Sequence, residues 1–134
     1  MSNRYTKEML NSIWNKATVV PGYDPDKYRQ DACGAWIINE EYNNRKSPFG
    51  WEVDHIFPES KLLELNVPEE LINDIVNLQP LNWLNNTSKG NDYPSYQSKV
   101  KADGEKNIIN ESQFIVNRNK LLEIKNLYAE YLPE

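Results

Sequence analysis

The amino-acid sequence predicts an α+β fold. Two observations lead to this class. Apolar residues recur at helical spacing over residues 6–17 and again over residues 111–132, which predicts a helix at each place. Between them lie short runs that are rich in β-branched and aromatic residues and are bounded by polar turns, a pattern typical of strands.

The first helix is predicted over residues 6–17, and Thr6 can cap its start. Its apolar stripe is formed by Met9, Leu10, Ile13, Trp14 and Ala17. The segment 19–31 contains Pro-Gly and Asp-Pro pairs, which predict a loop. Residues 32–38, "ACGAWII", form an apolar run that we expect to be buried, as either helix or strand.

The central elements are short. After a polar turn, a strand is predicted from Trp51 to about His55, with Trp51 and Val53 on one face. A short helix follows near residues 60–65, and a further helical turn begins at Pro68, whose fixed φ suits a first helical position.

A second short strand is predicted at residues 77–81, "NLQPL". Residues 82–91 predict a short helix or turn that stops near Gly90. Residues 100–109, "VKADGEKNII", have Asp-Gly between two alternating segments and predict a hairpin. The last predicted element is the long helix over residues 111–132, whose apolar face serves either the core or a partner helix. That face contains Phe114, Leu121, Ile124, Tyr128 and Tyr131.

Length and composition indicate one folded domain spanning residues 1–134. The sequence is 39% apolar and contains four Trp and eight Tyr, which excludes a disordered chain. No apolar run approaches the ~20 residues of a membrane span, and the first residues lack the layout of a signal peptide. Cys33 is the only cysteine, which excludes an internal disulfide and a zinc site of paired cysteines. A cytoplasmic protein with no membrane partner is therefore expected.

The net charge of −5 argues against a broad surface that coats nucleic acid. The charge is unevenly placed, because residues 59–74 are acidic whereas residues 86–106 carry four lysines. A polyanion would have to use a local basic patch.

The chain has a single histidine, His55, directly after Asp54 at the end of a predicted strand. Such a pair can be a core accident, a metal site or part of a catalytic site. The pair alone does not decide between these, and the polar residues that follow it in order have to be considered with it. Asn77 begins the second predicted strand, and Asn86 follows it by nine residues on the predicted helix.

The stretch "WEVDHIFPES … VNLQPLNWLNNTSKGND" resembles the HNH endonucleases, the ββα-metal (His-Me finger) nucleases, of a compact bacterial or phage type. The shared signature is Asp-His-Ile-x-Pro-x-Ser, then Asn-Leu-Gln-x-Leu, then Asn-x-x-Lys. The resemblance covers residues 51–92 strongly and residues 16–50 weakly. It implies a ββα-metal core at about 51–92, between an N-terminal flank of helix and loop (1–50) and a hairpin with a long helix (95–134).

The resemblance also implies an activity, the metal-dependent hydrolysis of DNA. Asp54 and Asn86 would hold a divalent metal, Mg²⁺ or else Mn²⁺, because carboxylate and amide oxygens suit these ions. His55 would be the general base that activates water, since its ordinary pKa of ~6.5 lies near working pH. Asn77 would brace the loop after the first strand and help to orient the imidazole.

Three further residues are candidates for gripping the substrate backbone: Lys89, three residues after Asn86, and Arg45 and Arg29 in the upstream flank. Glu52 shares a strand face with Asp54, and it is either exposed or a carboxylate behind the metal site.

The sequence departs from the family pattern in two ways. Twenty-one residues separate His55 from Asn77, where many relatives have a shorter turn, although a longer surface loop is tolerated. The third motif position is Asn rather than His, so the preferred ion can differ. The alternative function is an inactive HNH scaffold that binds nucleic acid or protein. No base-reading module is recognisable, so specificity is either low or supplied by a partner protein, and a homodimer remains open.

Overall fold

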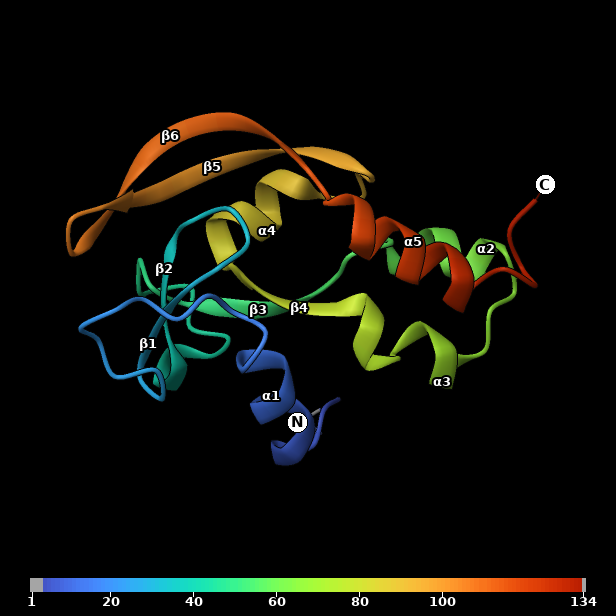
Figure 1. The fold of residues 1–134 in the computed structure, drawn as a ribbon, viewed down its shortest axis with the longest axis horizontal. Coiled ribbons are helices and arrows are strands. Elements are labelled where there is room, and N and C mark those ends of the chain that lie inside the picture. Colours follow the sequence, from blue (N-terminus) through green and yellow to red (C-terminus); the bar gives the residue numbers. More distant parts are fainter. Residues whose placement is uncertain (1–3, 134) are drawn as a thin grey trace.

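A computed structural model describes residues 4–133 of the chain (Figure 1). Helices are combined with three separate two-stranded antiparallel sheets, β1–β2, β3–β4 and β5–β6, which agrees with the predicted α+β class. The helices are α1 (Lys7–Trp14), α2 (Glu59–Glu64), α3 (Glu69–Ile72), α4 (Trp83–Lys89) and α5 (Arg118–Leu127), with 3₁₀ turns η1 (Asn39–Glu41) and η2 (Ile75–Asn77). The strands are β1 (Tyr28–Gln30), β2 (Trp36–Ile38), β3 (Trp51–His55), β4 (Leu78–Asn82), β5 (Ser95–Asp103) and β6 (Lys106–Ile115).

The centre of the molecule is the β3–β4 pair followed by α4. The strands pair from Trp51 opposite Asn82 to His55 opposite Leu78. The side chain of Asn82 accepts a hydrogen bond from the Leu84 amide and so caps α4 directly after β4. Gly90 ends the helix with φ +55° and ψ −128°, a conformation that favours glycine. The sequence therefore joins strand to helix with no loop between them.

The two faces of the β3–β4 pair support different hydrophobic cores. Helix α1, capped by Thr6 as predicted, packs on the face that carries Trp51 and Leu78. The opposite face, which carries Leu81, belongs to a second core. This core also contains Leu62 of α2, Ile72 of α3, Ile124 of α5 and Tyr128. Alternation along the strands produces this division, because successive side chains point to opposite faces.

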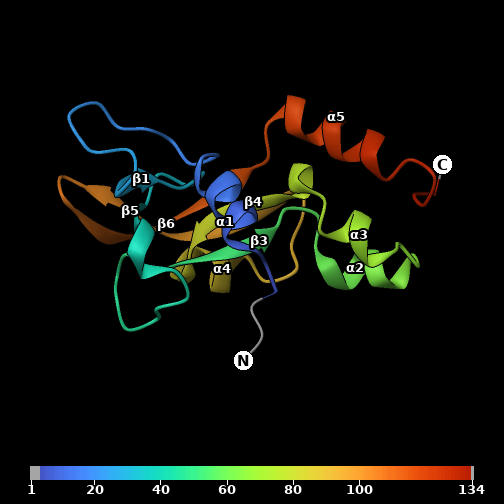
Figure 2. The ribbon, with the colours of Figure 1, turned by 90° about the horizontal axis from the view of Figure 1, so that it is seen from below.

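The other elements surround this centre (Figures 1 and 2). The β5–β6 hairpin arches over α4, and α4 packs against β5. Sheet β1–β2 and the hairpin tip lie at one end of the molecule, whereas α2, α3 and α5 lie at the other. No helix in the described residues is both long and apolar enough to cross a membrane.

Most predicted elements are confirmed, including the helix near 60–65, both central strands, and the hairpin turned at Gly104. The prediction of one helix over residues 111–132 is wrong, because residues 111–115 continue β6 and the helix begins only at Arg118. Phe114 packs against Tyr96 across the hairpin, with ring centroids 5.0 Å apart, and this cross-strand contact favours the strand. Strand β1 was predicted as loop.

Candidate active site

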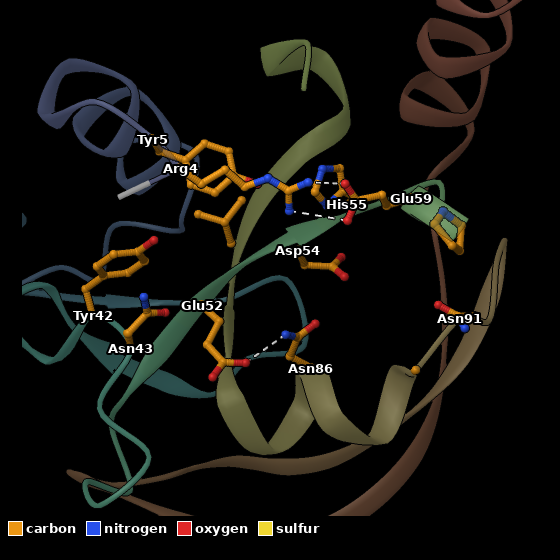
Figure 3. Close-up of a pocket in the computed structure, with 13 residues that line it drawn as sticks. Arg4, Tyr5, Tyr42, Asn43, Glu52, Asp54, His55, Glu59, Asn86 and Asn91 are labelled. Atoms are coloured by element: carbon orange, nitrogen blue, oxygen red, sulfur yellow. Dashed lines mark hydrogen bonds and ion pairs between the residues drawn. The ribbon is translucent and has the colours of Figure 1, made fainter. Parts of the chain in front are cut away.

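A polar cavity of about 460 Å³ lies along β3 and the end of α4 (Figure 3). Four parts of the chain form it: the N-terminal segment before α1, residues 42–43 after η1, strand β3 with the turn that leads into α2, and α4 with its C-terminal loop. Three of the predicted site residues, Asp54, His55 and Asn86, line it together. The remaining lining residues are Arg4, Tyr5, Tyr42, Asn43, Glu52, Val53, Pro58, Glu59, Gly90 and Asn91.

Asp54 is an almost fully buried carboxylate, with 5% of its surface exposed. The ammonium Nζ of Lys89 lies 3.1 Å from its Oδ1, and the Gln79 amide donates to its Oδ2 at 2.9 Å. Burial raises the pKa of the Asp54 carboxyl above its ordinary value, while the Lys89 ammonium and the Gln79 hydrogen bond act against this shift. The carboxylate therefore borders the cavity, while Lys89 and Gln79 hold both of its oxygens in place.

Lys89 does not occupy the position predicted for it. Only 1% of the residue is exposed, and its ammonium also donates to the His55 carbonyl at 3.1 Å. It lies 5.4 Å over the ring of Tyr96. The prediction of a phosphate contact is corrected accordingly: α4 turns Lys89 inward against β3, where its charge balances that of Asp54.

Asn86 and Glu52 form the other side of the cavity. The Asn86 amide nitrogen donates to Glu52 Oε1 at 2.9 Å, which leaves the amide oxygen on the side of Asp54 (Figure 3). Arg45 donates two hydrogen bonds to the same carboxylate, at 2.7 and 3.0 Å. Burial acts to raise the pKa of Glu52, but the bonds from Arg45 and Asn86 outweigh it and lower that pKa. Of the two interpretations left open for Glu52, the structure favours a carboxylate behind the site.

His55 is the last residue of β3, and its ring lies in the cavity. Its Nε2 lies 2.8 Å from Oδ1 of Asn73, the residue that follows α3. Because an amide oxygen only accepts hydrogen bonds, Nε2 is the donor in this contact, so Nδ1 is the nitrogen that a neutral imidazole would use as a base. Asn73 was not predicted as a site residue. No local signal marks it, since it lies 18 residues away in the long segment between the motif blocks.

Asn77 is fully buried and braces the turn after β3. Its side chain accepts from the Phe57 amide at 2.8 Å and donates to the Phe57 carbonyl at 3.0 Å. Its own backbone carbonyl accepts from Ile56 at 2.8 Å. These are the contacts that a loop-bracing role requires, whereas the imidazole is held by Asn73 instead.

The structure separates the two predicted arginines. Arg45 is more than half exposed and forms an ion pair with Glu52, which lines the cavity, but Arg45 itself is not a lining residue. Arg29 is only 8% exposed, and its guanidinium donates to the carbonyls of Pro25, Asn15 and Ala17. The prediction that Arg29 contacts substrate is wrong, because these bonds commit its donors to holding the loop around α1 together.

Arg4 is a further cavity residue that sequence reasoning missed. Its guanidinium forms an ion pair with Glu59, the first residue of α2, across the mouth of the cavity and beside His55 (Figure 3). It precedes the predicted helix and belongs to no motif, so only the tertiary structure brings it to this position.

The donor set can be tested against a divalent ion. Within residues 4–133, no three His, Cys, Asp or Glu side chains cluster closely enough to form a metal site by themselves. The cavity instead offers the carboxylate of Asp54 and the amide oxygen of Asn86, with Glu52 behind them. Oxygen donors with room for water fit Mg²⁺ or Mn²⁺, and they do not fit a four-coordinate structural zinc.

No protein-family model, curated protein or solved structure matches this chain.

Proposed function

We propose that this protein is a metal-dependent endonuclease of the HNH type that hydrolyses phosphodiester bonds in DNA. One observation carries the proposal: Asp54, His55 and Asn86 line one cavity, on a β3–β4–α4 unit in the order of a ββα-metal core. The sequence motif gives only the order of these residues along the chain, and their convergence on one cavity supports the proposal.

We infer that Asp54 and Asn86 hold a divalent metal, most readily Mg²⁺, with Mn²⁺ as an alternative. The bound ion would polarise the scissile phosphate and stabilise the leaving oxygen. Lys89 orients the Asp54 carboxylate from behind, and Glu52 orients the Asn86 amide by accepting from its nitrogen. Residues that hydrogen-bond to a metal ligand in this way hold the ligand in one orientation and adjust its basicity.

His55 is the proposed general base. Its Nε2–H is held by Asn73, so Nδ1 is available to take a proton from an attacking water in the cavity. Asn73 acts as a positioning residue, because it fixes both the orientation and the tautomer of the ring.

Two arginines are candidates for the substrate backbone, Arg45 from the sequence and Arg4 from the structure. Each is paired with a glutamate that lines the cavity, Glu52 and Glu59 respectively. A phosphodiester can compete for such half-exposed guanidinium groups, since exposed ion pairs contribute little stability. Sequence specificity and double-strand cutting would come from a partner protein or a second copy of the chain.

Cleavage of supercoiled plasmid in Mg²⁺ or Mn²⁺, with and without EDTA, tests the proposal. We expect nicked or linear DNA that EDTA abolishes, and a rate loss on the order of 10²–10⁴ for His55→Ala. The same assay with RNA tests the preference for DNA. Asn86→Ala should also be inactive, and its matched control is Asn110→Ala on the exposed side of β6.

Equal cleavage by wild type and His55→Ala would refute the role of His55. Nucleic-acid binding without any cleavage would instead favour the inactive scaffold.

A further inference from the structure

A second cavity, remote from the catalytic residues, is lined mainly by aromatic rings. Its volume is about 450 Å³, and its lining side chains are Tyr23, Tyr28, Trp36, Ile38, Phe49 and Glu105. They come from sheet β1–β2, from the segments before β1 and β3, and from the tip of the β5–β6 hairpin, at one end of the molecule (Figure 1). None of them lines the candidate active site.

The rings form walls that meet at an angle. The ring centroid of Tyr23 lies 4.7 Å from that of Trp36, with an interplanar angle of 54°, and 6.4 Å from that of Tyr28, with an angle of 78°. Trp36 is fixed from two sides, because its indole donates to the Gly104 carbonyl at 2.7 Å and its backbone amide donates to Asn107 at 2.8 Å. The hairpin tip thus holds the central ring in place before any ligand arrives.

The charge at this cavity is negative. Glu105 is its only charged lining residue, and the Tyr23 hydroxyl donates to its Oε2 at 3.2 Å. Among residues 4–133, no Lys or Arg forms an ion pair with Glu105. The neighbouring positions add Asp24 and Asp26 next to Tyr23, against Lys27 and against Lys106 next to Glu105, so the carboxylates outnumber the lysines by one when Glu105 is included. Ring faces are also negative in their quadrupole, so rings and carboxylate favour the same kind of ligand, an organic cation.

We propose that this aromatic pocket binds an alkylated ammonium group of the trimethylammonium type. A primary ammonium is strongly hydrated and brings three N–H donors, which the rings cannot satisfy. Methyl groups remove these donors and contact the ring faces, while the positive charge remains for the quadrupoles and for Glu105. The group can be carried by a methylated lysine of a partner protein or by a small molecule such as choline. This site is independent of the proposed nuclease activity.

Titration of the whole protein with choline, followed by NMR, tests the proposal. The readout is the indole N–H of Trp36, assigned with Trp36→Phe, and the comparison ligand is 3,3-dimethylbutan-1-ol, which has the same shape without charge. We expect choline to shift this signal saturably and to bind about tenfold more tightly than the alcohol, because the alcohol lacks the positive charge that the ring faces and Glu105 attract. Equal affinities, or no binding of either, would overturn the proposal.

Two variants separate the charge from the rings. Glu105→Gln should weaken choline several-fold and leave the alcohol unchanged, whereas Glu111→Gln, an exposed glutamate on β6, should change neither. Tyr28→Leu removes an exposed ring and should weaken choline without loss of folding.

Peptides distinguish the two sources of the ammonium group. A trimethyl-lysine peptide that binds more tightly than both choline and the unmodified peptide identifies a protein partner. Choline of equal or higher affinity identifies a small molecule. Binding of a nucleoside monophosphate in place of choline would mean that the rings stack a base, and would overturn the proposal.

Discussion

At the scale of single residues, the Lys89–Asp54 pair dominates the candidate site. Both side chains are buried, and each lies among groups that satisfy its hydrogen bonds. A buried pair of this kind adds little net stability, yet removal of one partner leaves the other as an uncompensated charge. The pair therefore couples the geometry of the site to the stability of the fold.

Replacement of Lys89 by Met tests this coupling. We expect Lys89→Met to lower the free energy of unfolding by about 3–5 kcal/mol, measured by urea denaturation. Without Lys89, the pKa of the Asp54 carboxyl in the folded state rises further, while in the unfolded chain this carboxyl ionises at its ordinary pKa. The loss in the free energy of unfolding should therefore grow as pH rises from about 5 to about 8, because the buried carboxyl resists ionisation in the folded state only. Lys125→Met, at an exposed position of α5, is the control. A loss that does not depend on pH would argue that packing, rather than charge, is responsible.

Cys33 gives a second test at this scale. Burial, assisted by the nearby Asp31 carboxylate, raises the pKa of the Cys33 thiol to about 12. The reactive thiolate is therefore scarce at neutral pH, and the thiol is shielded as well. We expect no reaction with a disulfide reagent in the native protein, and one equivalent of reaction after unfolding in urea. Rapid native labelling would contradict the packing around Cys33.

The site was predictable from the sequence only where its residues carry a local pattern. Asp54, His55 and Asn86 lie in ordered motifs, and all three border one cavity, although Asp54 and His55 are neighbours on β3 and point to opposite faces of the strand. Asn73 and Arg4 carry no such pattern, because long-range packing brings them to the cavity. The inward turn of Lys89 depends on how α4 rests on β3, and no periodicity within seven residues of helix determines that rotation.

At the scale of elements, the junction from β4 to α4 and the end of α4 position Asn86. Asn82 starts the helix, and Gly90 stops it with a backbone conformation that L side chains rarely adopt. The stop near Gly90 was predicted from the sequence, as were strands β3 and β4, whereas the cap at Asn82 was not. The β6–α5 boundary was not, because residues 111–115 fit helical spacing as well as alternation, and only pairing with β5 decides between the two.

Gly90 provides the test for this junction. A Cβ at Gly90 would meet no atom within 4 Å, so any cost of Gly90→Ala comes from the backbone alone. We expect a loss of about 1–3 kcal/mol in the free energy of unfolding. Gly104→Asn is the matched control, since Asn tolerates a positive φ and the cost there should be smaller. An unaffected Gly90→Ala would mean that the end of α4 readjusts without strain.

At the scale of the whole molecule, two cores share one pair of strands. Leu78 and Leu81 of β4 are both fully buried, but on opposite faces of the sheet and in different cores. The strands cannot leave one core without disturbing the other. Cooperative unfolding of the described chain follows from this arrangement.

Truncation of each core tests this cooperativity. Leu78→Ala and Leu81→Ala should each lower the free energy of unfolding by about 2–5 kcal/mol. In both variants, tryptophan fluorescence and far-UV circular dichroism should report one coincident transition. Leu122→Ala, at a half-exposed position, should change stability by less than about 0.5 kcal/mol. Separate transitions for the two probes would indicate that the cores fold independently.

The long segment between His55 and Asn77 affects any attempt to make a smaller version of this protein. By length it looks like a dispensable insertion, since it stands where a tight turn would suffice to connect two strands. Yet it carries Asn73, whose side-chain oxygen accepts the hydrogen bond from Nε2 of His55. It also contributes Leu62, Val67 and Ile72 to the core around α5. A shortened chain would need a substitute acceptor for the imidazole and a new cover for α5.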